Sequence, residues 1–132
     1  LIVDNIDDVL QYGGQFFGLR EFYAQYGLGS GLMCWRNYDA RIFQIYEKFM
    51  ENSTANMNNN RSGDQQYIGS IIGKSMDYAQ DLYPRAIVSY KKDCVNGQRE
   101  VCIPDGAKIV CFHGPPRPKH VIHEEIKGHW RG

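Results

Sequence analysis

The sequence predicts a mixed α/β fold, because short apolar runs of strand length are separated by segments with helical periodicity. The runs 86–90 and 109–112 have the composition of buried strands. The segments 42–50 and 67–72 repeat their apolar residues at the spacing of an amphipathic helix. A chain of 132 residues has room for one core, so we predict a single domain, 1–132.

The N-terminal third is predicted to contain strands joined by glycine-rich turns. Residues 1–3 are typical of the end of a buried strand, and 4–10 of a short helix with acidic residues in its first turn. A strand is expected at 16–19 and another at 32–35. Alternate glycines at 27–31 precede that strand, whereas in a dinucleotide-binding loop they would follow one. We interpret this segment as a loop that lets the backbone approach a ligand.

The middle third is predicted to be helical. The first helix is capped by Asn37 or Asp39, and we expect its apolar face to lie in the core. That face is formed by Ile42, Phe43, Tyr46, Phe49 and Met50. The asparagine-rich segment 52–61 is interpreted as a mobile surface loop. A second helix then carries Asp64 and Gln65 in its first turn, where the helix dipole favours a carboxylate.

The last apolar strand, 109–112, ends in a segment with the composition of a ligand site. His113 and Gly114 follow it directly, and Arg117 stands between prolines. A buried strand that brings an imidazole, an open backbone and a guanidinium to its carboxyl end is a common architecture for an anion or metal site at the edge of a sheet. We therefore place the chemistry of the protein in 113–117.

A short C-terminal helix is predicted to begin at Lys119. Three of its apolar residues are expected to face the core: Val121, Ile122 and Ile126. His120 and His123 also lie on this pattern, and residues three apart share a helix face. Together with His113 and Cys111 they are candidate zinc ligands, which leaves a metal hydrolase as an alternative function.

The four cysteines do not form a zinc-ribbon pattern, because none stand in a Cys-x-x-Cys pair. Cys94 and Cys102 flank a predicted hairpin turn at Asn96 and Gly97. A two-residue turn there would place Cys94 opposite Arg99, which favours free thiols over a disulfide. Reduced cysteines indicate a reducing compartment.

Charge and hydropathy exclude several classes of partner. Lys and Arg together number 15, as do Asp and Glu, so no net field recruits nucleic acid or an anionic membrane. The sequence shows neither a signal peptide nor the roughly 20 apolar residues of a membrane span. We expect a cytoplasmic protein of bacterial or viral origin, with peripheral membrane association left open for a full-length form.

Three segments, taken in their order, resemble the metal-dependent glycosyltransferases of the GT-A fold. They are the Gly-Ser-Gly turn at 29–31, the Gly-Asp-Gln at 63–65 and the Phe-His-Gly-Pro-Pro-Arg-Pro at 112–118. The chain is most similar to the group that includes glycogenin and the bacterial lipopolysaccharide galactosyltransferases. The resemblance implies a GT-A-like mixed sheet flanked by helices.

The resemblance also implies roles for four residues near the sugar. Ser30 and Gly31 match a segment that lines the sugar site, although Gly29 stands where the family has Asn. Asp64 and Gln65 match the family's Asp-Gln and are the expected catalytic residues, placed near the donor sugar and the acceptor.

Further roles follow for the segment after the last strand. Gly114 matches a glycine that closes over the diphosphate, and Arg117 replaces a lysine in the same loop. A guanidinium can bind a diphosphate through two parallel hydrogen bonds, so the replacement of lysine by arginine preserves the diphosphate-binding role. Cys111 stands at the family's metal-ligand position, and we expect His113, on the same strand face, to bind the divalent metal, Mn²⁺ or alternatively Mg²⁺.

The start of the chain departs from the family. Residues 1–8 resemble the segment immediately after the family's Asp-x-Asp motif, so the motif and the N-terminal nucleotide-binding half are expected to lie upstream. The sheet would then be incomplete and the fragment inactive alone. An exposed strand edge at 1–3 would favour a homodimer.

The function implied by the resemblance is transfer of a hexose from a nucleotide diphosphate sugar to a saccharide or glycolipid acceptor. Nine tyrosines suit polar clefts that contact sugars, so a non-catalytic carbohydrate-binding or interaction module is the alternative.

Overall fold

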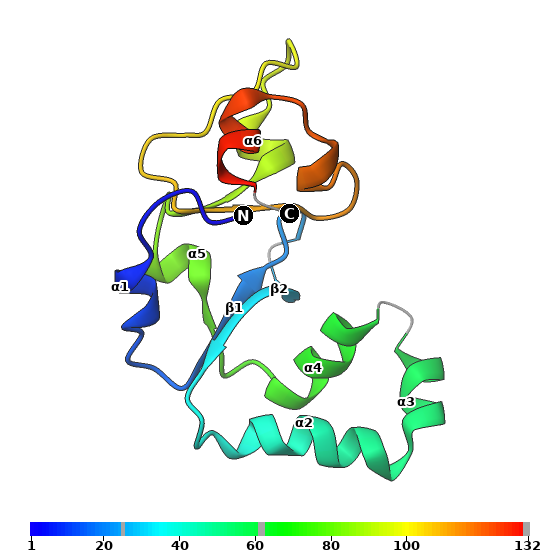
Figure 1. Cartoon of the computed structure of the whole chain (residues 1–132). Coiled ribbons are helices and arrows are strands. Elements are labelled where there is room, and N and C mark those ends of the chain that lie inside the picture. Colours follow the sequence, from blue (N-terminus) through cyan, green and yellow to red (C-terminus); the bar gives the residue numbers. More distant parts are fainter. Residues whose placement is uncertain (25, 61–62, 131–132) are drawn as a thin grey trace. The chain divides into compact units, whose positions relative to one another are not determined.

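The computed structural model describes residues 1–24, 26–60 and 63–130. The backbone forms two compact units (Figure 1). The inserted unit is Gly13–Ala79, and the outer unit combines Leu1–Tyr12 with Gln80–Gly132. Both contain helices and strands, so the predicted mixed α/β class is confirmed. Within the described ranges, no helix combines the length and the apolar character that crossing a membrane requires.

The inserted unit contains a three-stranded mixed sheet with the order β2-β1-β3. The strands are β1 (Phe16–Arg20), β2 (Leu28–Trp35) and β3 (Asp77–Tyr78). β2 runs antiparallel to β1, and β3 runs parallel to it. The strand predicted at 16–19 is therefore confirmed, whereas β2 starts earlier than the predicted 32–35.

A bulge interrupts β2 within its glycine-rich segment. Met33 of β2 pairs with Gly18 of β1, but the next residue of β1, Leu19, pairs with Gly29. Residues 30–32 of β2 therefore have no partner on β1. Bulges of this kind bend a strand and redirect its side chains, and they are common beside functional sites. The segment predicted as a close-approach loop is thus a bulge inside a longer strand.

The first predicted helix is α2 (Ala40–Glu51), and it is capped as expected by Asp39. The Asp39 carboxylate accepts hydrogen bonds from the backbone N–H of Arg41 at 3.0 Å and from its guanidinium at 2.6 Å. Arg41 also donates to the carbonyl of Ser75 at 2.9 Å. The cap therefore ties the start of α2 to the segment that follows α4 (Asp64–Ile72).

The prediction that the whole apolar face of α2 lies in the core is wrong. Phe43, Tyr46 and Met50 are 59%, 68% and 57% exposed. The core cluster of this unit takes up only the side of α2 that carries Ile42 and Ile45. The apolar stripe of α2 is wider than the surface that covers it, so its remaining residues face solvent.

The asparagine-rich segment is also different from its prediction. A third helix, α3 (Ser53–Asn59), replaces most of the predicted loop at 52–61. The side chain of Asn52 caps it by accepting a hydrogen bond from the backbone N–H of Ala55 at 3.1 Å. Capping by Asn52 offsets the poor helix propensity of the asparagines. Arg61, the last residue of the predicted loop, lies outside the described residues.

The outer unit contains a parallel pair of strands, β4 (Ile87–Ser89) and β5 (Ile109–Cys111). They pair in register from Ile87 opposite Ile109 to Ser89 opposite Cys111. The predicted strands at 86–90 and 109–112 are confirmed. Residues 1–3 pair with β5 as well, since Ile2 lies opposite Ile109 in an antiparallel bridge. A homodimer through the edge of 1–3 stays a prediction.

The remaining helices and turns are short. They are α1 (Asp7–Leu10), α5 (Ala79–Leu82), the π-helical turn η1 (Tyr90–Cys94), the 3-10 turn η2 (Pro118–His120) and α6 (Glu124–His129). The helix predicted at 4–10 is shorter than expected, since it begins at Asp7 and has no side-chain cap.

The hairpin around 96–97 is confirmed by the bridge between Val95 and Val101. Cys94 and Cys102 are free thiols, as expected, but the predicted register is wrong. The backbone N–H of Cys102 donates to the carbonyl of Cys94 at 2.9 Å, so Cys94 lies opposite Cys102 and not opposite Arg99.

The core of the outer unit holds its strands and α6 together. It consists of Val88, Tyr90, Cys94, Ala107, Val110, Val121 and Ile126. The expectation that Ile122 faces this core is wrong, because its side chain is 82% exposed. The helix begins at Glu124 and not at Lys119, so Ile122 lies in the extended link before it, where side chains do not follow helical spacing.

Candidate functional site

The carboxyl ends of β4 and β5 bring two segments of the outer unit together. Because the strands are parallel and in register, the chain leaves both at the same edge. Residues 89–92 leave β4, and 112–114 leave β5. Their aromatic rings, Tyr90 and Phe112, stack at 4.5 Å with an interplanar angle of 17°. We call the group formed by Ser89, Lys91, Lys92, His113 and Gly114 the strand-end site.

Ser89 is the centre of the hydrogen bonding in the strand-end site, and it is fully buried. Its Oγ lies 2.6 Å from Nε2 of His113. The backbone N–H of Lys92 donates to the same Oγ at 3.2 Å. The backbone N–H of Ser89 donates to Oδ2 of Asp93 at 2.7 Å. One serine therefore fixes both the η1 turn and the imidazole.

The surroundings of His113 favour its neutral form. Burial lowers the pKa of His113, and the positive charges of Lys91 and Lys92 lower it further. Asp93 acts in the opposite direction. Since the ordinary pKa of histidine is near 6.5, the imidazole is mainly neutral at pH 7.

Gly114 and Lys91 form the open side of the strand-end site. Gly114 has a φ of +74°, a conformation that side chains other than glycine rarely adopt. A Cβ at this position would lie 3.6 Å from Nζ of Lys91, so the glycine leaves the ammonium group beside bare backbone. Lys91 is exposed, and no carboxylate among the described residues pairs with it.

Arg117 follows three residues after Gly114, at the start of η2. Its side chain is exposed, and its guanidinium has no partner in the described part of the chain. Its backbone N–H donates to Nδ1 of His120 at 3.4 Å. The guanidinium is therefore available to a ligand.

The groups that the strand-end site presents suit an anion. Lys91 offers an ammonium group, the glycine leaves the backbone accessible, and Asp93 is already bound to the N–H of Ser89. Phosphate oxygens are bound in proteins by such combinations of cations and N–H groups.

The residues predicted to act on the sugar lie in the inserted unit. Ser30 and Gly31 occupy the bulge of β2. Asp64 is the first residue of α4, is exposed, and has no partner among the described residues. Gln65 donates from Nε2 to Oε1 of Glu21 at 2.8 Å. Sequence reasoning missed Glu21, which lies just after β1 without any motif.

The predicted site residues thus divide between the two units. The outer unit brings together His113 and Gly114, with Arg117 on the same loop. The inserted unit brings Asp64 next to Gln65 at the start of α4, and places Ser30 beside Gly31 in β2.

The described residues do not gather a set of ligands for the expected metal. Within 1–24, 26–60 and 63–130, no three His, Cys, Asp or Glu side chains are grouped closely enough to hold a metal ion. Nε2 of His113 is already hydrogen-bonded to Ser89. His120 accepts a hydrogen bond through Nδ1, and His123 is exposed before α6. Manganese at His113 and the zinc hydrolase with His120 and His123 remain predictions.

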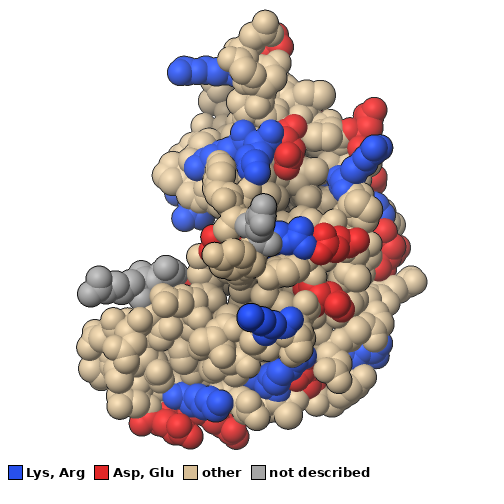
Figure 2. Space-filling model, turned by 180° about the vertical axis from the view of Figure 1, so that it is seen from behind, with Lys and Arg blue, Asp and Glu red and all other residues tan. Residues whose placement is uncertain are grey.

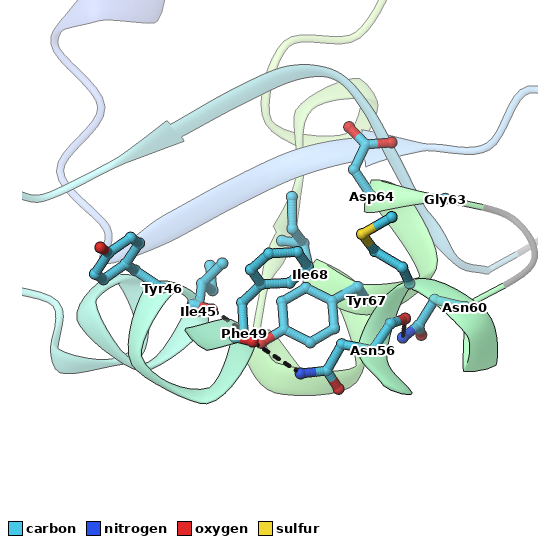
Figure 3. Close-up of a pocket in the computed structure, with 10 residues that line it drawn as sticks. Ile45, Tyr46, Phe49, Asn56, Asn60, Gly63, Asp64, Tyr67 and Ile68 are labelled. Atoms are coloured by element: carbon cyan, nitrogen blue, oxygen red, sulfur yellow. Dashed lines mark hydrogen bonds between the residues drawn. The ribbon is translucent and has the colours of Figure 1, made fainter. Parts of the chain in front are cut away.

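A second candidate is an apolar pocket between α2, α3 and α4, with a volume of about 570 Å³ (Figure 3). Its lining residues are Ile45, Tyr46, Phe49, Asn56, Met57, Asn60, Gly63, Asp64, Tyr67 and Ile68. A pocket of this size is typical of small-molecule sites. Its Asp64 was predicted from the sequence, but its walls were not, because α3 was expected to be a loop.

Hydrogen bonds hold the pocket walls in place. The rings of Phe49 and Tyr67 meet edge to face at 5.5 Å. The Tyr67 hydroxyl donates to the carbonyl of Ile45 at 2.9 Å. The Asn56 amide donates to the carbonyls of Lys48 at 2.8 Å and Phe49 at 3.3 Å, which ties α3 to the end of α2. The pocket is therefore preformed.

Sequence reasoning also missed Ser89, Lys91 and Lys92. The sequence did contain a signal, because the two lysines follow directly after the apolar run 86–90, just as His113 follows 109–112.

Basic and acidic side chains are interspersed on the face drawn in Figure 2, without a broad patch of either sign.

Comparison of the chain with protein-family models, with curated proteins and with solved structures finds no match.

Proposed function

We propose that the chain binds the diphosphate of a nucleotide sugar at the strand-end site and takes part in transfer of the hexose to a saccharide or glycolipid acceptor. One observation carries the proposal: Lys91 and Gly114 lie side by side at the carboxyl ends of two parallel strands, next to His113. The guanidinium of Arg117 on the same loop, which has no partner among the described residues, adds a second cation. The order of the three sequence segments supports the same reading.

The chemistry explains why cations are needed. In hexose transfer, the bond between the anomeric carbon and the diphosphate oxygen breaks. The oxygen of the acceptor hydroxyl bonds to that carbon and its proton passes to water, while the nucleoside diphosphate leaves with one additional negative charge. Preorganised cations and N–H groups stabilise such developing charge strongly. We assign this role to Lys91 and Arg117.

The resemblance assigns the contacts with the sugar to residues of the inserted unit, and we propose these contacts for that unit by itself. Ser30 and Gly31 would contact the hexose through the bulged backbone of β2. The carboxylate of Asp64 has no partner in the described part of the chain and is suited to accept hydrogen bonds from sugar hydroxyls, and Gln65 is oriented by Glu21. Asp64 and Gln65 keep the catalytic roles that the resemblance implies.

A divalent cation, when bound, would neutralise the diphosphate and assist its departure. The described residues do not complete a site for it, so no step is assigned to manganese or magnesium here.

Arg117→Ala tests the proposal. We expect its Kd for uridine diphosphate, measured by calorimetry, to rise about tenfold, since a hydrogen bond to a charged group contributes roughly 1.5 kcal/mol or more. With the full-length protein and manganese, we expect slower release of uridine diphosphate from UDP-glucose or UDP-galactose. Lys74→Ala is the matched control, because Lys74 is an exposed cation of the inserted unit. Equal affinities and rates in Arg117→Ala and the wild type would overturn the proposal.

The preformed apolar pocket favours a second candidate, a non-catalytic module that binds the apolar part of a carbohydrate derivative. If this is correct, octyl β-glucoside below its micelle concentration will shift the methyl signals of Ile45 and Ile68 in a methyl-labelled sample. Methyl β-glucoside will not, because the pocket offers few polar groups to a bare sugar. The exposed Ile122 of the outer unit is the internal control. Equal shifts with both glucosides, or shifts at all three isoleucines, would contradict this candidate.

A further inference from the structure

The apolar pocket between α2, α3 and α4 contains one charged side chain. Among the described residues that line it, Asp64 alone carries a charge at neutral pH. This carboxylate is exposed at the start of α4, and it has no partner within the described part of the chain. Figure 3 shows it at the edge of the group of apolar side chains, apart from the amide of Asn56. The pocket therefore combines an apolar interior with a negative charge at its edge.

Hydrogen bonds within the protein already use several donors of the pocket. Nδ2 of Asn56 donates to two carbonyls at the end of α2, at 2.8 and 3.3 Å. The Tyr67 hydroxyl donates to the carbonyl of Ile45 at 2.9 Å. Nδ2 of Asn60 donates to the carbonyl of Asn56 at 2.6 Å. No donor in 1–24, 26–60 or 63–130 binds the side-chain oxygens of Asn56, Asn60 and Tyr67, so these side chains offer a ligand mainly acceptors.

The charges near the pocket also favour a cation. Burial raises the pKa of the Tyr67 hydroxyl, and the negative charge of Glu51 at the end of α2 raises it further. Glu51 therefore adds to the negative potential at the pocket wall that Tyr67 forms. Lys48 is exposed on the same helix and does not line the pocket. A cationic ligand is thus attracted to the pocket, whereas an anionic ligand is repelled.

We infer that this pocket binds an apolar amine, whose alkyl or aryl body lies among the apolar side chains and whose ammonium group pairs with Asp64. The body would contact Ile45, Phe49, Tyr67 and Ile68, which line the pocket. An aliphatic amine is protonated at neutral pH, as the lysine side chain is, with a pKa of about 10.4. The inference goes beyond hexose transfer and needs no phosphate. Asp64 is also assigned to the sugar, so the test uses neither sugar nor nucleotide.

Probes that share one alkyl chain but differ in charge test the inference: octylammonium chloride, 1-octanol and sodium octanoate. The methyl-labelled chain is titrated with each, below its micelle concentration or solubility limit, and the signals of Ile45 and Ile68 are followed. We expect a Kd for octylammonium about tenfold lower than for octanoate, with octanol between them, because Asp64 attracts one head group and repels the other. The exposed Ile122 should not shift. Equal Kd values for octylammonium and octanoate, or unshifted Ile45 and Ile68 signals with octylammonium, would overturn the inference.

Asp64→Asn tests the ion pair, because it removes the charge and keeps the size of the side chain. Asp64 is exposed, so we expect the variant to fold normally. Its Kd values for octylammonium and octanoate should differ by less than about threefold. Asp105→Asn is the matched control, since it makes the same change at an exposed carboxylate of the outer unit, and it should keep the wild-type difference. A wild-type difference retained in Asp64→Asn, or lost equally in both variants, would contradict the pairing of the ammonium group with Asp64.

Discussion

Lys91→Glu is expected to raise the Kd of the chain for uridine diphosphate by about 10- to 150-fold, because one charge-assisted hydrogen bond contributes about 1.5–3 kcal/mol. The new carboxylate would also lie beside Gly114, where the ammonium group now stands, and would repel the phosphates. Lys91 is exposed and has no carboxylate partner among the described residues, so the variant should fold normally. Calorimetry at two salt concentrations measures the effect.

Lys74→Glu is the matched control, since it makes the same change of net charge at an exposed lysine of the inserted unit. The wild-type affinity should fall with rising ionic strength, because salt screens exposed charges. That dependence should be weaker in Lys91→Glu. A similar loss of affinity in both variants would mean that net charge, and not the strand-end site, binds the ligand.

The second large effect is expected for the core beneath the site. Ile126→Ala should lower the free energy of unfolding by about 2–5 kcal/mol, because it removes a fully buried side chain and leaves a cavity. Ile126 packs in the same cluster as Val88 and Val110, whose strands carry the strand-end site. We therefore expect affinity for uridine diphosphate to be lost at the same urea concentration as the fold of the outer unit.

Ile122→Ala makes the same chemical change four residues earlier, at a side chain that is 82% exposed. Its cost should stay within about 0.5 kcal/mol, as is usual for surface substitutions. Urea unfolding followed by circular dichroism compares the two variants. Equal costs would contradict the observed start of α6 at Glu124 and restore the predicted helix from Lys119.

Much of the fold could be predicted where a local pattern determines the structure. The apolar runs at 86–90 and 109–112 predicted β4 and β5, and the helical spacing at 42–50 predicted α2. The pattern failed for α3, because its stability depends on a cap at Asn52 and on bonds to the end of α2. It also failed for residues around Ile122, since a start of α6 at Glu124 changes which side chains face inward.

The site could be predicted only in part, because a local sequence pattern does not show which distant residues the fold brings together. His113 and Gly114 were found because they follow a strand-like run directly. Ser89 and Lys91 join them only because β4 and β5 pair in parallel and in register, which is a long-range property that no local pattern contains. The resemblance supplied roles for Asp64 and Gln65, but not Glu21, which orients Gln65.

The most direct test of the central claim is a titration of the nitrogen-labelled chain with uridine diphosphate, without added metal, followed through the backbone amide signals. We predict that the largest shifts occur at Lys91, Lys92, His113 and Gly114, because these residues surround the proposed anion site. Shifts confined to residues 13–79, or no shifts at millimolar ligand, would contradict the claim that the carboxyl ends of β4 and β5 bind the diphosphate.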